Sequence, residues 1–399
     1  MKLKGIALIT LAFFVPISIF VTDVAVFCLV ILWLFEGQFK SKWNKIKSSP
    51  WIISLLALLF LYVVGMLWGP NHQGAEWLFQ KSALLLLLPI LYTFNFSQKE
   101  VKYSLFAFLS ATTLSALIAS LINLGLIKHL FKYSSIFANN WQNPAFITYT
   151  EHNIFLAFSL LVSFFLLYNS YSNRTLRIGL ILISILFLMN LYAEKGRSGQ
   201  FAFIFIFLSF SIITFWNKKR LIFLSVIAIV GVNLTAYFSS TQFNQRIRKI
   251  QIQVNQLEKN KTNNLNTRYY LFKYSFEKIK EKPVFGYGTG SFVKEFSSIS
   301  EHATKILAGV HKTPHNNYLF IWFELGLVGL LVFLSIFFFQ LKAYKSLNQG
   351  YFRMIFPAVF LVIMMTDTYL QNHNTAVLYC YLSFIFSTYS FDKYVLFFD

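Results

Sequence analysis

The feature that most restricts the fold of this chain is a series of apolar runs long enough to cross a lipid bilayer. A membrane-spanning helix needs about 20 predominantly apolar residues, and about twelve such runs follow one another along the chain. The first run has no small-residue cleavage site and an equally apolar run follows it, so we expect a retained helix rather than a signal peptide. The expected spans begin near Gly5, Val24, Trp51, Ser82, Tyr103, His152, Ile178, Gln200, Leu221, Asn316, Met354 and Asn374.

Composition agrees with a membrane protein. Of the 399 residues, 56% are hydrophobic and only 13% are charged, and a soluble domain of this length could not bury so much apolar surface. The two cysteines, Cys28 and Cys380, lie inside apolar runs and offer neither a disulfide framework nor a metal cluster. The sequence therefore predicts an all-α polytopic membrane protein.

The distribution of Lys and Arg predicts the orientation. With a cytoplasmic N-terminus, 17 cations fall in the inner segments and five in the short outer loops, as the positive-inside rule requires. Both termini are then cytoplasmic, and the long connection faces the extracytoplasmic side. We expect nine helices in residues 1–238, an extracytoplasmic loop over 239–315 and three helices in 316–399.

The long loop is basic, with 13 cations against five acids. This charge favours an anionic partner such as a lipid headgroup or a phosphorylated lipid. Nucleic acid is disfavoured because the loop faces outward and contains no known binding module. The pattern predicts an amphipathic helix over 245–260. It also predicts a second helix, which Thr267 caps and Pro283 ends, with Arg268 in its first turn. A solvated basic loop near anionic lipid remains the simpler alternative.

Two further motifs in this loop suggest ligand sites. Gly286, Gly288 and Gly290 could form a phosphate-binding loop, but the strand and helix that should flank such a loop are missing. Packing against the membrane domain is favoured instead. Histidines and an acid could suggest zinc, but Pro314 disfavours a continuous helix through the closest pair and no third ligand is placed by spacing. These zinc candidates are Glu301, His302, His311 and His315.

Three polar clusters stand at the expected outer ends of membrane helices. They are "TEHN", with His152 and Asn153, "EKGRSG", with Lys195 and Arg197, and "TPHNN", with His315 and Asn316. Each could be an ordinary helix start, and in the last cluster Thr313 is a suitable N-cap and Pro314 a suitable first residue. Their common side of the membrane instead favours the rim of one shared cavity.

His315 is the strongest candidate for catalysis in these clusters. In the first turn of a helix the dipole disfavours imidazolium, which leaves a neutral ring able to accept a proton. Glu324 follows nine residues later, about 13 Å deeper along the helix at about 1.5 Å per residue. An acid inside the membrane is a functional candidate, although a structural partner within the bundle is favoured.

Several of these motifs together resemble the O-antigen ligase and polymerase superfamily. They are "EHNIFLAF", "GRSG", "TR" early in the long loop, "PVFGYGTGSF" and "PHNNYLFIWFELGLVGLLVFL", and they cover roughly Glu151 to Leu334. The resemblance implies a C-type membrane glycosyltransferase fold in the bacterial inner membrane, with its active site facing the periplasm. It further implies an undecaprenyl-diphosphate-linked glycan donor, Arg197 and Arg268 as diphosphate-binding residues and His315 as the catalytic residue. The chemistry implied needs no metal or other cofactor.

Lys195, His152, Asn153, Asn316, His311 and Glu324 complete the candidate site as substrate-binding residues. The function favoured is O-antigen ligation, in which the glycan passes to an acceptor hydroxyl on lipid A-core. A polymerase that extends the lipid-linked glycan is the alternative within the same family. A membrane transporter is the alternative from another class, but carriers place charges near the bilayer midplane, whereas these polar clusters lie at helix ends.

Overall fold

The computed structural model describes residues 2–70, 72–127, 144–169, 173–240, 267–300 and 312–389, together with residues 244, 245, 248 and 252. Helices joined by short turns and loops make up these residues, and they contain no strand. Most of the amphipathic helix expected over 245–260 lies outside them.

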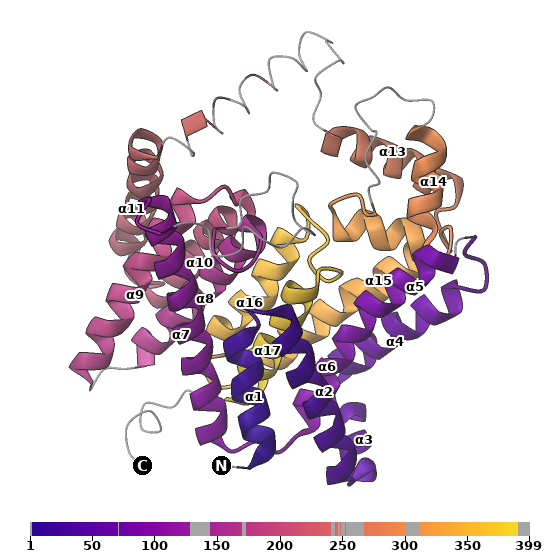
Figure 1. Ribbon diagram of the computed structural model, residues 1–399, viewed down its shortest axis with the longest axis horizontal. Coiled ribbons are helices and arrows are strands. Elements are labelled where there is room, and N and C mark those ends of the chain that lie inside the picture. Colours follow the sequence, from indigo (N-terminus) through magenta and orange to yellow (C-terminus); the bar gives the residue numbers. More distant parts are fainter. Residues whose placement is uncertain are drawn as a thin grey trace.

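The helices form a bundle with a smaller helical part at one end (Figure 1). They are α1 (Leu3–Phe14), α2 (Ile19–Glu36), α3 (Phe39–Lys47), α4 (Pro50–Gly65), α5 (His72–Ala83), the 3₁₀ turn η1 (Leu84–Leu86), α6 (Leu87–Thr93), α7 (Gln98–Asn123), α8 (Tyr149–Asn169), α9 (Arg174–Ala193), α10 (Arg197–Thr214), α11 (Lys219–Ser239), α13 (Thr267–Glu281), α14 (Ser291–Ser300), α15 (Asn317–Lys345), α16 (Gly350–Ile363) and α17 (His373–Thr388).

The prediction of a multi-pass helical membrane protein is confirmed, but the count of twelve spans is not. Within the described part of the chain, eight helices are long and apolar enough to cross a membrane. A ninth is possible if α3 and α4, which meet at a bend of 99°, form one span. Each of the twelve expected segments does coincide with helix, but α1, α16 and α17 have only 12, 14 and 16 residues.

Burial separates central helices from helices that face outward. Almost every residue of α17 is buried, and 78% of the apolar window of α8 is buried inside the bundle. For α11 the corresponding share is 11%, and large apolar side chains such as Phe223, Leu224 and Ile227 are exposed on it. An exposed apolar surface of this kind is what lipid contact requires.

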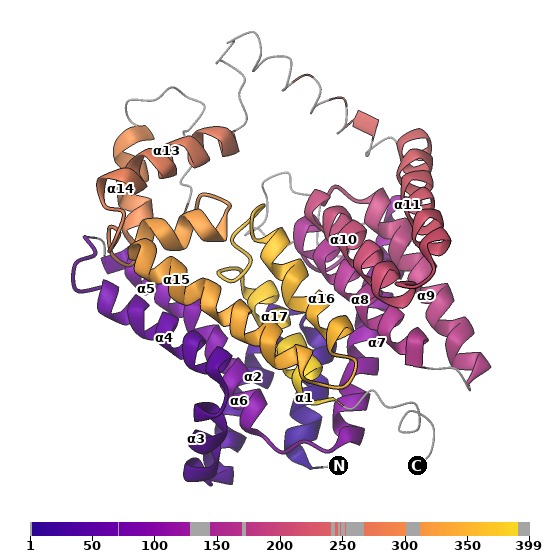
Figure 2. The same cartoon turned by 180° about the vertical axis from the view of Figure 1, so that it is seen from behind.

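The two ends of the bundle differ. Helices α13 and α14 lie at one end, and α3 lies at the other (Figures 1 and 2). The start of α1 and the end of α17 meet the start of α7, because Lys2 N–H donates to Glu100 Oε1 at 3.3 Å and Gln98 Nε2 donates to the Thr388 carbonyl at 3.3 Å. Both ends of the described chain therefore lie on one side of the bundle.

The helix α15 is broken at Gly326, where φ is 69°. The break frees backbone groups, and the segment after α13 binds them. Leu327 N–H donates to the Pro283 carbonyl at 2.8 Å, while the Phe323 carbonyl accepts from Tyr287 N–H at 2.9 Å. Buried backbone groups inside a membrane must be paired in this way, so the break depends on residues 283–290.

The glycine-rich motif lies in this segment, residues 283–290. Its packing on α4 and α15 agrees with the predicted loop against the membrane domain. Gly286, Gly288 and Gly290 all have positive φ, at 70°, 93° and 82°. A Cβ at Gly288 would lie 2.5 Å from the backbone of Gly69, so only glycine allows the loop to approach α4 and the turn after it so closely.

Glu324 holds the same segment from inside the bundle. Its side chain is fully buried and accepts hydrogen bonds from the backbone N–H groups of Gly290, Ser291 and Phe292, the last at 2.9 Å. These N–H groups begin α14, where a negative charge is stabilised by the helix dipole. The favoured reading of Glu324, a structural partner within the bundle, agrees with this geometry.

Candidate active site

The start of α15 positions the polar cluster that contains His315. Asn316 is the N-cap, and its Oδ1 accepts from the N–H groups of Tyr318 at 2.9 Å and Leu319 at 3.1 Å. The predicted start at Thr313 and Pro314 is therefore wrong, since the helix begins at Asn317. The physical reason is that Asn caps a helix as well as Thr does, and the Thr313 hydroxyl is instead paired with Thr368.

His315 lies in the left-handed region of backbone space, with φ 54°. Such a conformation costs energy for a residue with a side chain and persists where the surroundings impose it, often at functional sites. The residue precedes the N-cap, so the expected place in the first turn of the helix is also wrong. The helix dipole therefore does not act on the ring as the sequence predicted. Neighbouring groups must instead determine its tautomer.

Asp367 is the group that contacts the imidazole. It belongs to the loop between α16 and α17, residues 364–372, and its Oδ1 lies 3.0 Å from His315 Nδ1. The same oxygen accepts from Thr368 N–H at 2.8 Å, which fixes the carboxylate. When Nδ1 carries the proton and donates it to a carboxylate, the lone pair of the neutral ring is on Nε2. Asp367 thus orients the ring and selects the tautomer that can accept a proton at Nε2.

Arg268 approaches the other oxygen of the same carboxylate. Its Nη2 lies 3.9 Å from Asp367 Oδ2, and the two side chains are 37% and 14% exposed. Burial acts to raise the pKa of the Asp367 carboxyl, but the hydrogen bond from His315, the Thr368 N–H and the charge of Arg268 together hold this pKa below its ordinary value. Asp367 is accordingly a carboxylate at neutral pH.

Arg197 is the first residue of α10, and the positive charge of Arg268 acts on it. Within the described part of the chain no carboxylate forms an ion pair with Arg197. The neighbouring Ser198 hydroxyl lies 2.9 Å from the Thr366 hydroxyl, which attaches the start of α10 to the loop that carries Asp367. The charges of Arg197 and Arg268 thus act on each other at this site, and a pair of guanidinium groups suits a phosphorylated anion.

Asn153 of α8 hydrogen-bonds to the turn before α10. The Asn153 Nδ2 donates to the carbonyls of Leu191 at 3.1 Å and Gly196 at 2.8 Å. A Cβ at Gly196 or Gly199 would lie under 3 Å from Asn153, so both glycines are required for this close packing. The "EHN" and "GRSG" motifs are therefore two halves of one structural unit.

The remaining predicted residues occupy different places. His152 is buried, with Nδ1 3.2 Å from the Ser115 hydroxyl, and Asn153 is also fully buried, so neither lies on a cavity rim as expected. Lys195 is half-buried in the turn before Arg197. His311 lies outside the described residues, as do two of the other zinc candidates, Glu301 and His302.

Asp367 is the residue at this site that was not predicted from the sequence. The signal was present, because it is the first acid after Glu324 and stands between two apolar segments on the predicted outer side. The three predicted polar clusters stand at the starts of membrane helices. Asp367 instead lies within the short loop between the last two helices, so no helix-start motif includes it. A search for acids at every outer turn would have found it.

Comparison with known proteins shows which family the chain is similar to. Residues 181–334 match the O-antigen ligase family model, a range that contains Arg197, Arg268 and His315 but not Asp367. The chain is 28% identical over 313 residues to an "Uncharacterized protein" of Haemophilus influenzae, which is 74% of each chain. It is 33% identical over 97 residues, 24% of each chain, to the "Putative polysaccharide ligase RC0486" of Rickettsia conorii. Residues 181–334 thus match the O-antigen ligase family, and the family resemblance of the motifs is confirmed.

Proposed function

We propose that this protein is a membrane glycosyltransferase of the O-antigen ligase type. It moves a glycan from undecaprenyl diphosphate to a hydroxyl group of an acceptor, at the periplasmic face of the bacterial inner membrane. The observation that carries the proposal is the contact of His315 with Asp367 at 3.0 Å, beside Arg268, in a chain whose residues 181–334 match the O-antigen ligase family. The acceptor proposed is lipid A-core.

His315 acts as the general base. The acceptor hydroxyl gives its proton to Nε2 of the ring, and its oxygen forms a bond to the anomeric carbon of the first donor sugar. The bond between this carbon and the diphosphate oxygen breaks, and its electron pair stays on the departing diphosphate. Asp367 stabilises the imidazolium that results, as a carboxylate does beside a catalytic histidine.

Arg197 and Arg268 bind the diphosphate. Its negative charge grows as the glycosidic bond breaks, so donors that are already in place stabilise the transition state more than the ground state. The forked guanidinium groups can contact two phosphate oxygens each. Because these two cations supply the charge that a divalent ion would otherwise supply, the proposed reaction is independent of metal.

The test is transfer by the purified protein. Undecaprenyl-diphosphate-linked glycan is incubated with lipid A-core, and the products are separated by gel and mass spectrometry. Glycosylated lipid A-core is the expected product, and the His315→Ala protein serves as the matched negative control. Longer lipid-linked glycan without glycosylated lipid A-core would instead assign a polymerase.

Movement of the intact lipid-linked glycan between leaflets, with no new glycosidic bond, would refute the enzyme and assign a transporter. The same vesicles can report both events, because a lectin added outside detects movement and mass spectrometry detects bond formation.

A further inference from the structure

The short helix α3 carries a concentration of positive charge that the helix after it lacks. Four of its nine residues are lysines, Lys40, Lys42, Lys45 and Lys47, and none is acidic. The helix α4, which follows at an angle of 99°, is uncharged over all 16 of its residues. Hydrocarbon suits α4, whereas burying four lysines there would be costly. With α4 across the bilayer, α3 therefore lies along the membrane surface.

Buried contacts determine which side of α3 faces outward. The Lys42 Nζ donates to the Trp33 carbonyl at 2.7 Å and lies 3.2 Å from Glu36 Oε2. Lys42 and Ile46, which are one turn apart, are both buried. These contacts hold one side of α3 against the end of α2, so the opposite side must face away from the bundle.

The exposed side of α3 combines aromatic rings with positive charge. Phe39 and Trp43 are 52% and 51% exposed. Lys40 and Lys47 are also exposed, and Lys47 Nζ lies 5.4 Å from the centre of the Trp43 ring. Within the part of the chain that the structure describes, no carboxylate forms an ion pair with Lys40 or Lys47. Spacings of three, four and seven residues place side chains on one face of a helix, so these four form a continuous surface.

The surface that leads to α3 faces lipid. The helix α2 is long and apolar enough to cross a membrane, and only 17% of its apolar window is buried. Its last turn exposes Leu34 and Phe35, by 52% and 84%, and α3 begins at Phe39. The exposed side of α3 therefore continues a lipid-facing surface, at the end of the bundle remote from α13 and α14 (Figures 1 and 2).

We propose that the exposed side of α3 binds anionic phospholipid. The rings of Phe39 and Trp43 enter the boundary between headgroups and acyl chains, where aromatic side chains are enriched. Lys40 and Lys47 contact the headgroup phosphates, and each lysine near an anionic membrane surface strengthens binding about fivefold. This binding requires neither donor nor acceptor, so it is independent of glycan transfer.

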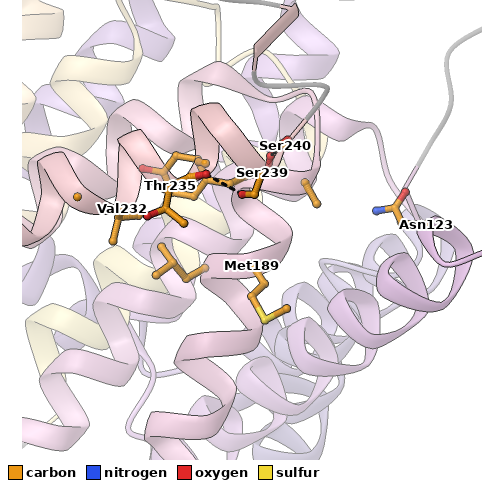
Figure 3. A pocket seen from close by; sticks show the side chains of 11 residues that line it. Asn123, Met189, Val232, Thr235, Ser239 and Ser240 are labelled. Atoms are coloured by element: carbon orange, nitrogen blue, oxygen red, sulfur yellow. Dashed lines mark hydrogen bonds between the residues drawn. The ribbon is translucent and has the colours of Figure 1, made fainter.

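The groove between α9 and α11 differs from the exposed side of α3. It has a volume of about 830 Å³, and none of the described residues that line it is charged (Figure 3). A phospholipid there would contact apolar walls and uncharged polar groups, which offer no fixed charge to attract an anionic headgroup. Selectivity for anionic lipid is therefore expected at α3 and not in this groove.

The test is photocrosslinking of the full-length protein in nanodiscs of phosphatidylcholine with a minor share of phosphatidylglycerol. Benzoylphenylalanine replaces Trp43, which keeps an aromatic ring there, and mass spectrometry counts the lipid adducts. Phosphatidylglycerol should be enriched at least about fivefold over its share of the nanodisc lipid. Benzoylphenylalanine in place of Phe60, which is 65% exposed and about 15 Å along α4 from Pro50, should give adducts in the nanodisc ratio.

Charge variants separate α3 from other cations at the same end of the bundle. In the protein with the photoreactive residue at position 43, Lys40→Gln together with Lys47→Gln should return the adducts to the nanodisc ratio. Lys218→Gln together with Lys219→Gln removes the same charge from the turn between α10 and α11, where both lysines are exposed, and should leave the enrichment unchanged. Melting temperatures establish that all variants are folded.

Three results would overturn the proposal. Adducts at position 43 in the nanodisc ratio would show that α3 contacts lipid without selecting charge. Enrichment that survives the replacement of Lys40 and Lys47 would assign the selectivity to other groups. Absence of lipid adducts at position 43, in a protein that does form them at position 60, would show that α3 faces water or a protein partner.

Discussion

Replacing Asp367 with Asn tests how the imidazole is held. The substitution preserves the size of the side chain but removes its charge. The amide nitrogen then takes the place of one carboxylate oxygen, either Oδ1, which lies 3.0 Å from His315 Nδ1, or Oδ2, which lies 3.9 Å from Arg268 Nη2. If the amide N–H faces Nδ1, the ring proton moves to Nε2 and the nitrogen that should accept a proton is occupied. The corresponding substitution in serine proteases lowers kcat about 10⁴-fold for this reason.

The expected loss in transfer rate for Asp367→Asn is therefore about 10²- to 10⁴-fold, or about 3 to 5 kcal/mol of transition-state stabilisation. The expected change in stability is much smaller. Arg268 is more than one third exposed and lies 3.9 Å from the carboxylate, and an ion pair of this kind contributes at most about 1 kcal/mol. The melting temperature should consequently fall by only a few degrees.

The assay is transfer from undecaprenyl-diphosphate glycan at saturating donor, with the donor Kd and melting temperature measured on the same protein. Asp23→Asn is the matched control, because Asp23 Oδ1 also contacts a histidine, His373 Nε2, at 2.6 Å but outside the cluster around His315. Asp23→Asn should transfer glycan at about the wild-type rate. A rate for Asp367→Asn within tenfold of wild type, in a folded protein, would refute the role assigned to Asp367.

Three further predictions follow from the geometry of the site. Arg197→Lys and Arg268→Lys keep the positive charge but lose the paired guanidinium donors, so each should raise the donor Kd at least about tenfold. Near-wild-type binding by both variants would show that these residues contribute only general electrostatic attraction. Asn153→Ala removes the amide donor from the Leu191 and Gly196 carbonyls, the first of which still accepts from Gln200 Nε2. The substitution should destabilise the protein by roughly 1–3 kcal/mol in denaturant titration and also raise the donor Kd, whereas unchanged stability would show that Asn153 does not support the turn. The pKa of Asp367 is lowered in the folded protein, so its stabilising contribution is complete above the unfolded pKa of about 4 and is lost as pH falls below it through the folded pKa. The melting-temperature difference between wild type and Asp367→Asn should therefore shrink as pH falls below about 4, and a constant difference would contradict this prediction.

Hydropathy and local motifs predicted much of the architecture. Every expected span coincides with helix because twenty apolar residues in a bilayer have few alternatives to a helix. The number of true spans was not predictable in the same way. α1, α16 and α17 are shorter than a bilayer crossing requires, and a window of apolar residues does not reveal where hydrogen bonding ends a helix.

The site was predicted in part. Arg268 and His315 lie 47 positions apart in the sequence, and both contact the carboxylate of Asp367. The contact is made through Asp367, which no local pattern links to either residue. The break at Gly326 was equally hidden, because its backbone groups are paired by residues 283–290, a tertiary contact that helical periodicity cannot show.

The central claim is that His315 accepts the proton of the acceptor hydroxyl. The most direct measurement is the single-turnover transfer rate of purified His315→Ala protein, with Asn316→Ala as the neighbouring control. We expect His315→Ala to bind the lipid-linked donor normally, to keep its melting temperature and to lose transfer by about 10²- to 10⁴-fold.

Asn316→Ala should lose the helix cap, with a cost of about 1 kcal/mol in stability and a smaller effect on rate. Transfer by a folded His315→Ala protein at close to the wild-type rate would contradict the account.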